Sequence, residues 1–181
     1  MLFCNIDIMD ENLDYQKNMY VGVEGATITY IGADEPADAT KYGERYNGKG
    51  KLLMSAFYNT HAHTPMTLLR GYAENQPLQQ WLNNTVWPFE GKMHPGHYAI
   101  GARLSMAEML RYGVIGYSDM YFGGIENCEA AIESGMKLNH ADGGTMFMDD
   151  YTKCPSFETN NKLFADYAGA ADGRIKIDLC I

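Results

Sequence analysis

The pattern of apolar and polar positions changes near residue 51. Before that point, short apolar stretches interrupted by polar residues predict β-strands joined by tight turns. Residues 20–31 have the pattern of a hairpin, with Gly25 in the turn. The stretch 32–50 is rich in Gly, Asp, Glu and Ala and is predicted to be loop or sheet edge. Residues 1–50 are therefore expected to form a small unit of β-structure.

From residue 51 the pattern alternates between strands and helices. Apolar residues at helical spacing predict helices after Pro77, from Pro95 to Arg111, at 125–134 and at about 156–170. The apolar runs between them predict strands at about 52–59, 114–120, 136–141 and 174–181. This order implies a parallel sheet connected by helices, and so an α/β fold.

Two histidines follow the first predicted strand of this α/β region, in the sequence Asn59-Thr60-His61-Ala62-His63. Side chains two positions apart on a strand point to the same side, so His61 and His63 can direct their imidazoles at one point. A divalent metal needs this geometry from two neighbouring ligands. Catalytic sites use about three protein ligands, so the pair forms only part of a site. Histidine pairs accept zinc, iron, nickel or manganese.

Other residues have two interpretations each. His94 and His97 flank the predicted start of a helix, and they are either a second metal pair or exposed histidines at a helix start. His140 lies near a strand end and either faces the same site or packs as an ordinary histidine. Trp81 and Trp87 serve helix packing or line a substrate pocket.

Composition narrows the classes of partner. The 181 residues carry a formal net charge of −9 and no cluster of Lys and Arg, which argues against a nucleic-acid partner. No apolar run approaches the ~20 residues that span a bilayer. The N-terminus does not resemble a signal peptide, so we expect a cytoplasmic protein without a membrane partner. The four cysteines are widely spaced and are expected to be free thiols.

Four stretches carry a family resemblance: 50–54 (GKLLM), 59–71 (NTHAHTPMTLLRG), 87–90 (WPFE) and 116–121 (GYSDMY). Together they resemble the amidohydrolase superfamily, and within it the 5-methylthioadenosine/S-adenosylhomocysteine deaminases and their chlorohydrolase relatives. The long run at 59–71 is far more specific than two histidines alone. The resemblance implies the N-terminal half of a metal-dependent (β/α)8 barrel, strands one to four, over 51–181. It also implies part of a small β-sandwich over 1–50.

The resemblance also implies roles for single residues. His61 and His63 match two ligands of the family's divalent metal, and zinc is the metal expected here. Glu90 matches the carboxylate that binds the ribose hydroxyls, since a carboxylate can accept hydrogen bonds from both. Asp119, at the end of the second barrel strand, would support the site. The implied activity is metal-dependent hydrolytic deamination of adenine nucleosides of the 5′-methylthioadenosine or S-adenosylhomocysteine type.

The sequence also departs from the family pattern. Ser55-Ala56 stands where the family usually has Pro-Gly, and 137–142 lacks the arginine that these deaminases carry near position 142. The later histidines, the proton-transferring glutamate and the last aspartate of the family do not occur before Ile181. We therefore expect a truncated fragment that is inactive alone, and its open sheet edges predict a homo-oligomer. The alternatives are a non-catalytic half-barrel that serves as an interaction or structural module, or another amidohydrolase of the chlorohydrolase, cytosine deaminase or guanine deaminase type.

Overall fold

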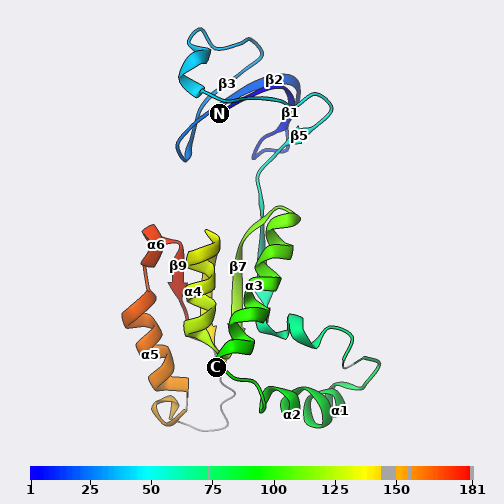
Figure 1. The fold of residues 1–181 in the computed structure, drawn as a ribbon, viewed down its shortest axis with the longest axis vertical. Coiled ribbons are helices and arrows are strands. Elements are labelled where there is room, and N and C mark those ends of the chain that lie inside the picture. Colours follow the sequence, from blue (N-terminus) through cyan, green and yellow to red (C-terminus); the bar gives the residue numbers. More distant parts are fainter. Residues whose placement is uncertain (73, 144–149, 155, 180–181) are drawn as a thin grey trace. The chain divides into compact units, whose positions relative to one another are not determined.

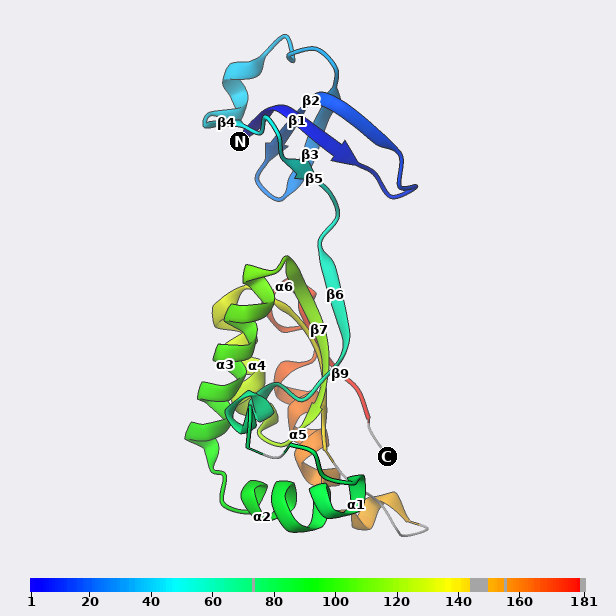
Figure 2. The ribbon, with the colours of Figure 1, turned by 90° about the vertical axis from the view of Figure 1, so that its right-hand side faces the viewer.

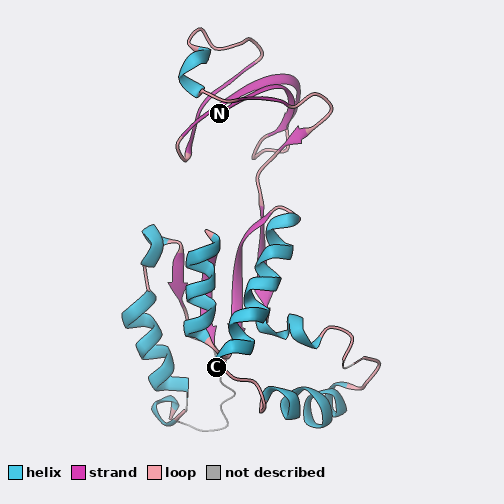
Figure 3. Ribbon diagram, in the orientation of Figure 1, coloured by secondary structure: helices cyan, strands magenta, loops and turns pink. Residues whose placement is uncertain are grey.

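The structure is a computed structural model that describes residues 1–72, 74–143, 150–154 and 156–179. The chain divides into two compact units, Met1–Ala56 and Phe57–Ile181. Figure 1 shows the elements of both units in chain order, and Figure 3 distinguishes their helices, strands and loops.

The first unit is a five-stranded sheet with the order β3-β2-β1-β4, in which β5 also pairs with β1. β2 is antiparallel to β1 and to β3, whereas β4 and β5 run parallel to β1. Gly25 has a φ of 59° in the turn between β2 and β3, which confirms the predicted hairpin. The strands are β1 Leu2–Met9, β2 Tyr15–Glu24, β3 Thr27–Gly32, β4 Arg45–Asn47 and β5 Leu52–Leu53, and a 3₁₀-helix, η1, covers Ala39–Tyr42.

The second unit is a parallel four-stranded sheet with the order β6-β7-β8-β9, and helices follow its strands. Figure 2 shows α3 and α4 on the same side of this sheet. The alternation of strands and helices confirms the predicted α/β class. The strands are β6 Phe57–Ala62, β7 Val114–Tyr121, β8 Lys137–Asp142 and β9 Ile175–Ile177; the helices are α3 Pro95–Arg111, α4 Gly124–Ser134, α5 Ser156–Tyr167 and α6 Ala170–Gly173, with a 3₁₀-turn, η4, at Tyr151–Lys153.

A long connection between β6 and α3 carries much of the candidate site. It begins with a 3₁₀-helix, η2, at Thr64–Leu69 and continues in a helical run that starts after Pro77, as predicted. In that run the π-helical segment η3 is wider than its α-helical neighbours and changes the direction in which the following side chains project. The run consists of α1 Leu78–Trp81, η3 Leu82–Val86 and α2 Trp87–Glu90.

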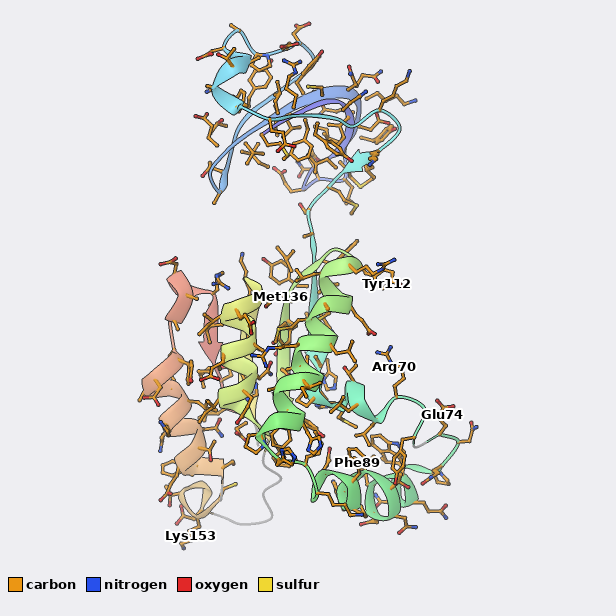
Figure 4. All side chains as sticks on the ribbon, in the orientation of Figure 1. Arg70, Glu74, Phe89, Tyr112, Met136 and Lys153 are labelled. Carbon is orange, nitrogen blue, oxygen red and sulfur yellow. The ribbon has the colours of Figure 1, made fainter. Side chains whose placement is uncertain are left out.

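The core of the second unit lies between the sheet and the helices. Its fully buried side chains include Leu163 of α5 and Met136, which is labelled in Figure 4. The backbone of α3 approaches η2 closely, since a β-carbon at Gly101 would lie 2.6 Å from the carbonyl oxygen of Pro65. Because Gly101 has no side chain, the segment after the histidine pair can pack directly against the backbone of α3.

Three predicted elements differ from the structure. The predicted strand at 52–59 is wrong, because Leu52–Leu53 pairs with β1 in the first sheet and Phe57 begins a strand of the second. The predicted helix at 156–170 ends at Tyr167, because Gly169 adopts a left-handed φ of 82° before α6. The last strand is shorter than the predicted 174–181 and covers Ile175–Ile177, and residues 180–181 lie outside the described part.

The thiols of Cys4, Cys128 and Cys154 are free and buried, whereas Cys180 lies outside the described residues. Burial raises the pKa of the Cys128 thiol to about 12, so this group stays protonated and unreactive. Across the described parts of the chain, the helices are too short or too polar to span a bilayer.

Candidate metal and nucleoside site

The two predicted metal ligands lie at the carboxyl end of β6. His61 is on the strand and His63 directly follows it. Their ring centroids are 4.8 Å apart, with the ring planes at 83°. His61 is exposed and His63 is half-buried. The carboxyl end of a barrel strand is where enzymes of this architecture place their chemistry.

The imidazole of His63 is oriented by the backbone of the neighbouring strand. Its Nδ1 lies 2.6 Å from the carbonyl oxygen of Met120 on β7. Because a carbonyl can only accept, Nδ1 carries the proton and donates it, which leaves the lone pair on Nε2. Proteins commonly fix metal-binding histidines by such a hydrogen bond from the second ring nitrogen. The geometry of His63 therefore fits that of a metal ligand.

A pocket of about 190 Å³ adjoins His63. The helical run before α3 contributes Trp81, Trp87 and Glu90 to its lining, and β7 contributes Tyr121. The structure thus brings His63 and Glu90 to the same pocket, although 27 positions separate them in the sequence. The other lining residues are Met66, Leu82, Val86, Met120, Phe122 and Gly143.

The carboxylate of Glu90 is held by Tyr121, which lies on β7. The hydroxyl of Tyr121 donates to Oε1 of Glu90 at 2.7 Å. Burial raises the pKa of the Glu90 carboxyl, while the Tyr121 hydrogen bond and the nearby His63 oppose this shift. The pKa of the Tyr121 hydroxyl is itself raised, mainly by burial, so the group remains a donor. The Tyr121 hydrogen bond uses one of about four acceptor positions on the carboxylate.

Asp119 faces the helices and not the pocket, and it supports the segment after His63. Its carboxylate accepts the backbone N–H of Thr64 at 3.2 Å and the Thr64 hydroxyl. It also accepts a hydrogen from Nδ2 of Asn127 at 2.6 Å. The side chain is almost fully buried, and burial raises its pKa to about 6 against the effect of these hydrogen bonds.

His140 packs on the side of the sheet that faces α4, and it does not line the pocket. It is fully buried, its Nδ1 lies 3.2 Å from Nδ2 of Asn127, and its Nε2 has no hydrogen-bond partner within the described residues. Burial lowers the pKa of this imidazole from 6.5 to about 4, so His140 is neutral at pH 7. Of the two interpretations of His140, the structure therefore supports the packed one.

The free energy of unfolding is expected to depend on pH through His140. Between pH 6.5 and about 4 the unfolded chain binds a proton that the folded chain does not, so stability falls as pH falls through this range. Relative to His140→Gln, the wild-type chain should lose roughly 2–4 kcal/mol over this range. Urea unfolding of both chains at several pH values measures this difference.

The comparison with His140→Gln is needed because two buried carboxyls change the free energy of unfolding in the opposite direction. The pKa values of Asp119 and Asp142 are raised to about 6, so their contribution to stability falls as pH rises toward that value. Both carboxyls are present in the two chains, and their effect cancels in the difference. Parallel stability curves for wild type and His140→Gln would contradict the prediction.

His94 and His97 serve the start of α3. Their ring centroids are 3.8 Å apart, and Nδ1 of His97 accepts the backbone N–H of His94 at 3.3 Å. No group of three His, Cys, Asp or Glu side chains suited to a metal occurs in the parts of the chain that the structure describes. Neither histidine pair therefore has a third protein ligand among these residues.

Sequence reasoning missed three residues of this region. Thr64 and Tyr121 lie inside the quoted stretches, but no role followed from their positions. Asn127 gave no signal, because an asparagine within a helix usually lies on a solvated face. Its burial and its contacts become visible only once α4 is packed on the sheet.

Comparison with known proteins gives close relatives among nucleoside deaminases. The 5′-deoxyadenosine deaminase of Methanobrevibacter smithii is 36% identical over 155 residues, which cover 86% of this chain and 35% of that protein. The 5-methylthioadenosine/S-adenosylhomocysteine deaminase of Natronomonas pharaonis is 37% identical over 142 residues, or 77% and 33% of the two chains. The chain thus spans about a third of the length of these curated relatives.

Solved structures share the fold at lower identity. The zinc complex of atrazine chlorohydrolase from Arthrobacter aurescens TC1 superposes with a TM-score of 0.81 at 20% identity, covering 98% of this chain and 46% of that one. An adenosine deaminase from Xanthomonas campestris with bound zinc gives a TM-score of 0.71 at 23% identity, covering 98% and 42%. The predicted N-terminal half of an amidohydrolase (β/α)8 barrel is thereby confirmed.

The family itself follows from the sequence match. Residues 52–179 match the model of the amidohydrolase family, which is most of the chain and includes all four strands of the second unit. The chain therefore belongs to the amidohydrolase family.

Proposed function

We propose that this chain is the metal- and ribose-binding part of a zinc-dependent deaminase of adenine nucleosides. The observation that carries this proposal is the juxtaposition of His63 and Glu90 in one pocket, with the ring of His61 4.8 Å from that of His63. The names of the relatives from Methanobrevibacter smithii and Natronomonas pharaonis support adenine nucleosides as the substrate class.

The histidine pair suits zinc. Neutral imidazole nitrogens are common zinc ligands, and the hydrogen bond from Nδ1 of His63 to Met120 leaves Nε2 of His63 for the metal. A zinc ion supplies, when bound, the activation of water near neutral pH. We infer that the remaining ligands and the groups that transfer protons belong to the part of the relatives' length that this chain does not span.

The pocket suits a nucleoside on two counts. Glu90 can accept hydrogen bonds from the 2′- and 3′-hydroxyls of ribose while Tyr121 holds the carboxylate in place. Trp81 and Trp87 offer apolar surface for the adenine ring or the 5′-substituent. In the same proposal, the unit predicted over 1–50 is part of a β-sandwich and the unit predicted over 51–181 is the barrel part, with the boundary moved to Ala56 because Leu52–Leu53 pairs with β1.

A chimera tests this function. The chain replaces the matching region of the Methanobrevibacter smithii deaminase and is joined to the rest of that protein. We expect the chimera to release ammonia from 5′-deoxyadenosine and 5′-methylthioadenosine, measured with an ammonia-coupled assay and by the ultraviolet change from adenine to hypoxanthine.

The intact deaminase is the positive control. Zinc content and thermal unfolding of the chimera show whether it is folded and loaded. A folded, zinc-loaded chimera that leaves adenine nucleosides unchanged would overturn the proposal. Hydrolysis of guanine or of a chlorotriazine in their place would favour another amidohydrolase activity.

A further inference from the structure

A buried polar network connects α4 to the backbone that follows His63. Its members are at most 2% exposed and come from η2, β7, α4 and β8. Buried polar groups are costly unless they are satisfied, and satisfied networks hold their members in one geometry. The side chains are those of Thr64, Asp119, Asn127 and His140.

His63 is fixed from two sides by consecutive residues of β7. Its ring donates from Nδ1 to the carbonyl oxygen of Met120. The peptide that joins it to Thr64 donates its N–H to the carboxylate of Asp119, and the Thr64 hydroxyl donates to the same carboxylate. A displaced Asp119 would therefore release the backbone of His63 while also disturbing the segment that holds its ring.

Asn127 determines how the Asp119 carboxylate is held. Its Oδ1 accepts the hydroxyl of Tyr117 at 2.7 Å, and its Nδ2 lies 2.6 Å from Asp119 and 3.2 Å from Nδ1 of His140. A flipped amide would place Oδ1, an acceptor, against the carboxylate of Asp119, which also can only accept. These partners therefore permit one orientation of Asn127.

We propose that Asn127 is a positioning residue for the metal ligand His63, acting through Asp119 and Thr64. Asn127 does not line the pocket itself. The proposal rests on the proposed function only in assigning a metal to His63. The fixed geometry of the imidazole follows from its hydrogen bond to Met120 together with the network.

The test is Asn127→Ala in the intact chain, with two readouts. The first is the tautomer of His63, followed by ¹⁵N NMR of the imidazole nitrogens without metal. The wild-type chain should show one tautomer, protonated at Nδ1, and the variant a mixture of both. The second is the dissociation constant for Zn²⁺, which should rise by about 10-fold or more, as for other residues that orient metal ligands.

Two further variants separate positioning from loss of stability. Met136→Ala removes a buried side chain of the same core, four positions before His140 and without a side-chain hydrogen bond to the network, and it should leave both readouts unchanged. Thr64→Val keeps the shape and the backbone N–H of residue 64 but removes the hydroxyl, and it should shift both readouts in the direction of Asn127→Ala. Thr64→Val also keeps the test decisive if Asn127→Ala does not fold.

The outcomes distinguish this proposal from the proposed function. A changed tautomer in Asn127→Ala or Thr64→Val, together with an unchanged one in Met136→Ala, supports positioning. Equal changes in the network variants and in Met136→Ala, or no change in any of them, overturn it. A wild-type chain that does not bind Zn²⁺ would count against the proposed function, while the tautomer measurement would still decide the role of Asn127.

Discussion

Replacing His61 and His63 together by alanine is expected to abolish zinc binding by this chain. The two imidazoles lie at the same strand end with their centroids 4.8 Å apart, so the double variant removes both protein ligands identified among the described residues. Residues that merely orient a ligand change metal affinity by about 10–100-fold, and loss of the ligands themselves should exceed about 100-fold. Competition with a chromophoric chelator measures the dissociation constant.

The chain contains its own matched control. His94 and His97 form a second pair, with centroids 3.8 Å apart, so His94→Ala with His97→Ala removes the same number of imidazoles. Because these histidines serve the start of α3, this variant should keep its affinity for Zn²⁺. Loss of zinc from the second double variant and retention in the first would reverse the assignment of the site.

Glu90→Gln is expected to lower kcat/KM of the chimera for 5′-deoxyadenosine by about 10–100-fold, since a hydrogen bond to a charged group contributes roughly 1.5–3 kcal/mol. Glutamine keeps an oxygen for the Tyr121 hydroxyl but offers the ribose one acceptor fewer and no charge. Steady-state kinetics of the variant and the parent chimera measure the change.

The substrate provides the control for this prediction. With 2′,3′-dideoxyadenosine, which lacks both ribose hydroxyls, Glu90→Gln should change kcat/KM little. The affinity for zinc should also be unchanged, because Glu90 belongs to the ribose side of the pocket in this proposal. An equal loss for both nucleosides would show that Glu90 does not act on the ribose hydroxyls.

The local periodicity of apolar residues correctly predicted elements whose ends are marked by residues such as proline. The helix from Pro95 to Arg111 has proline at its first position and apolar residues at helical spacing, and the structure contains it with these bounds. Only part of these apolar residues is buried, since Met106 is in the core while Ile100 and Leu104 are exposed. The strand at 52–59 failed for a physical reason. An apolar run indicates that its residues can form a strand, but it does not indicate which sheet the strand joins. Residues of this run belong to two different sheets.

The candidate site shows the same limit. The family resemblance selected His61, His63 and Glu90, and the structure places His63 and Glu90 at one pocket, while their roles remain predictions. The hydrogen bond from Tyr121 to Glu90 and the contacts of Asn127 depend on packing between elements far apart in the sequence. Short-range patterns carry no information on such pairs.

The close approach of α3 to η2 has a consequence for the variation that this gene can tolerate. At codon 101 even the smallest replacement, alanine, would press on the backbone of Pro65, two residues after His63. Its neighbour Ile100 is 61% exposed and has no such constraint. Of the two glycines of α3, Gly96 and Gly101, only Gly101 meets backbone atoms this closely, so purifying selection on α3 should be strongest at position 101.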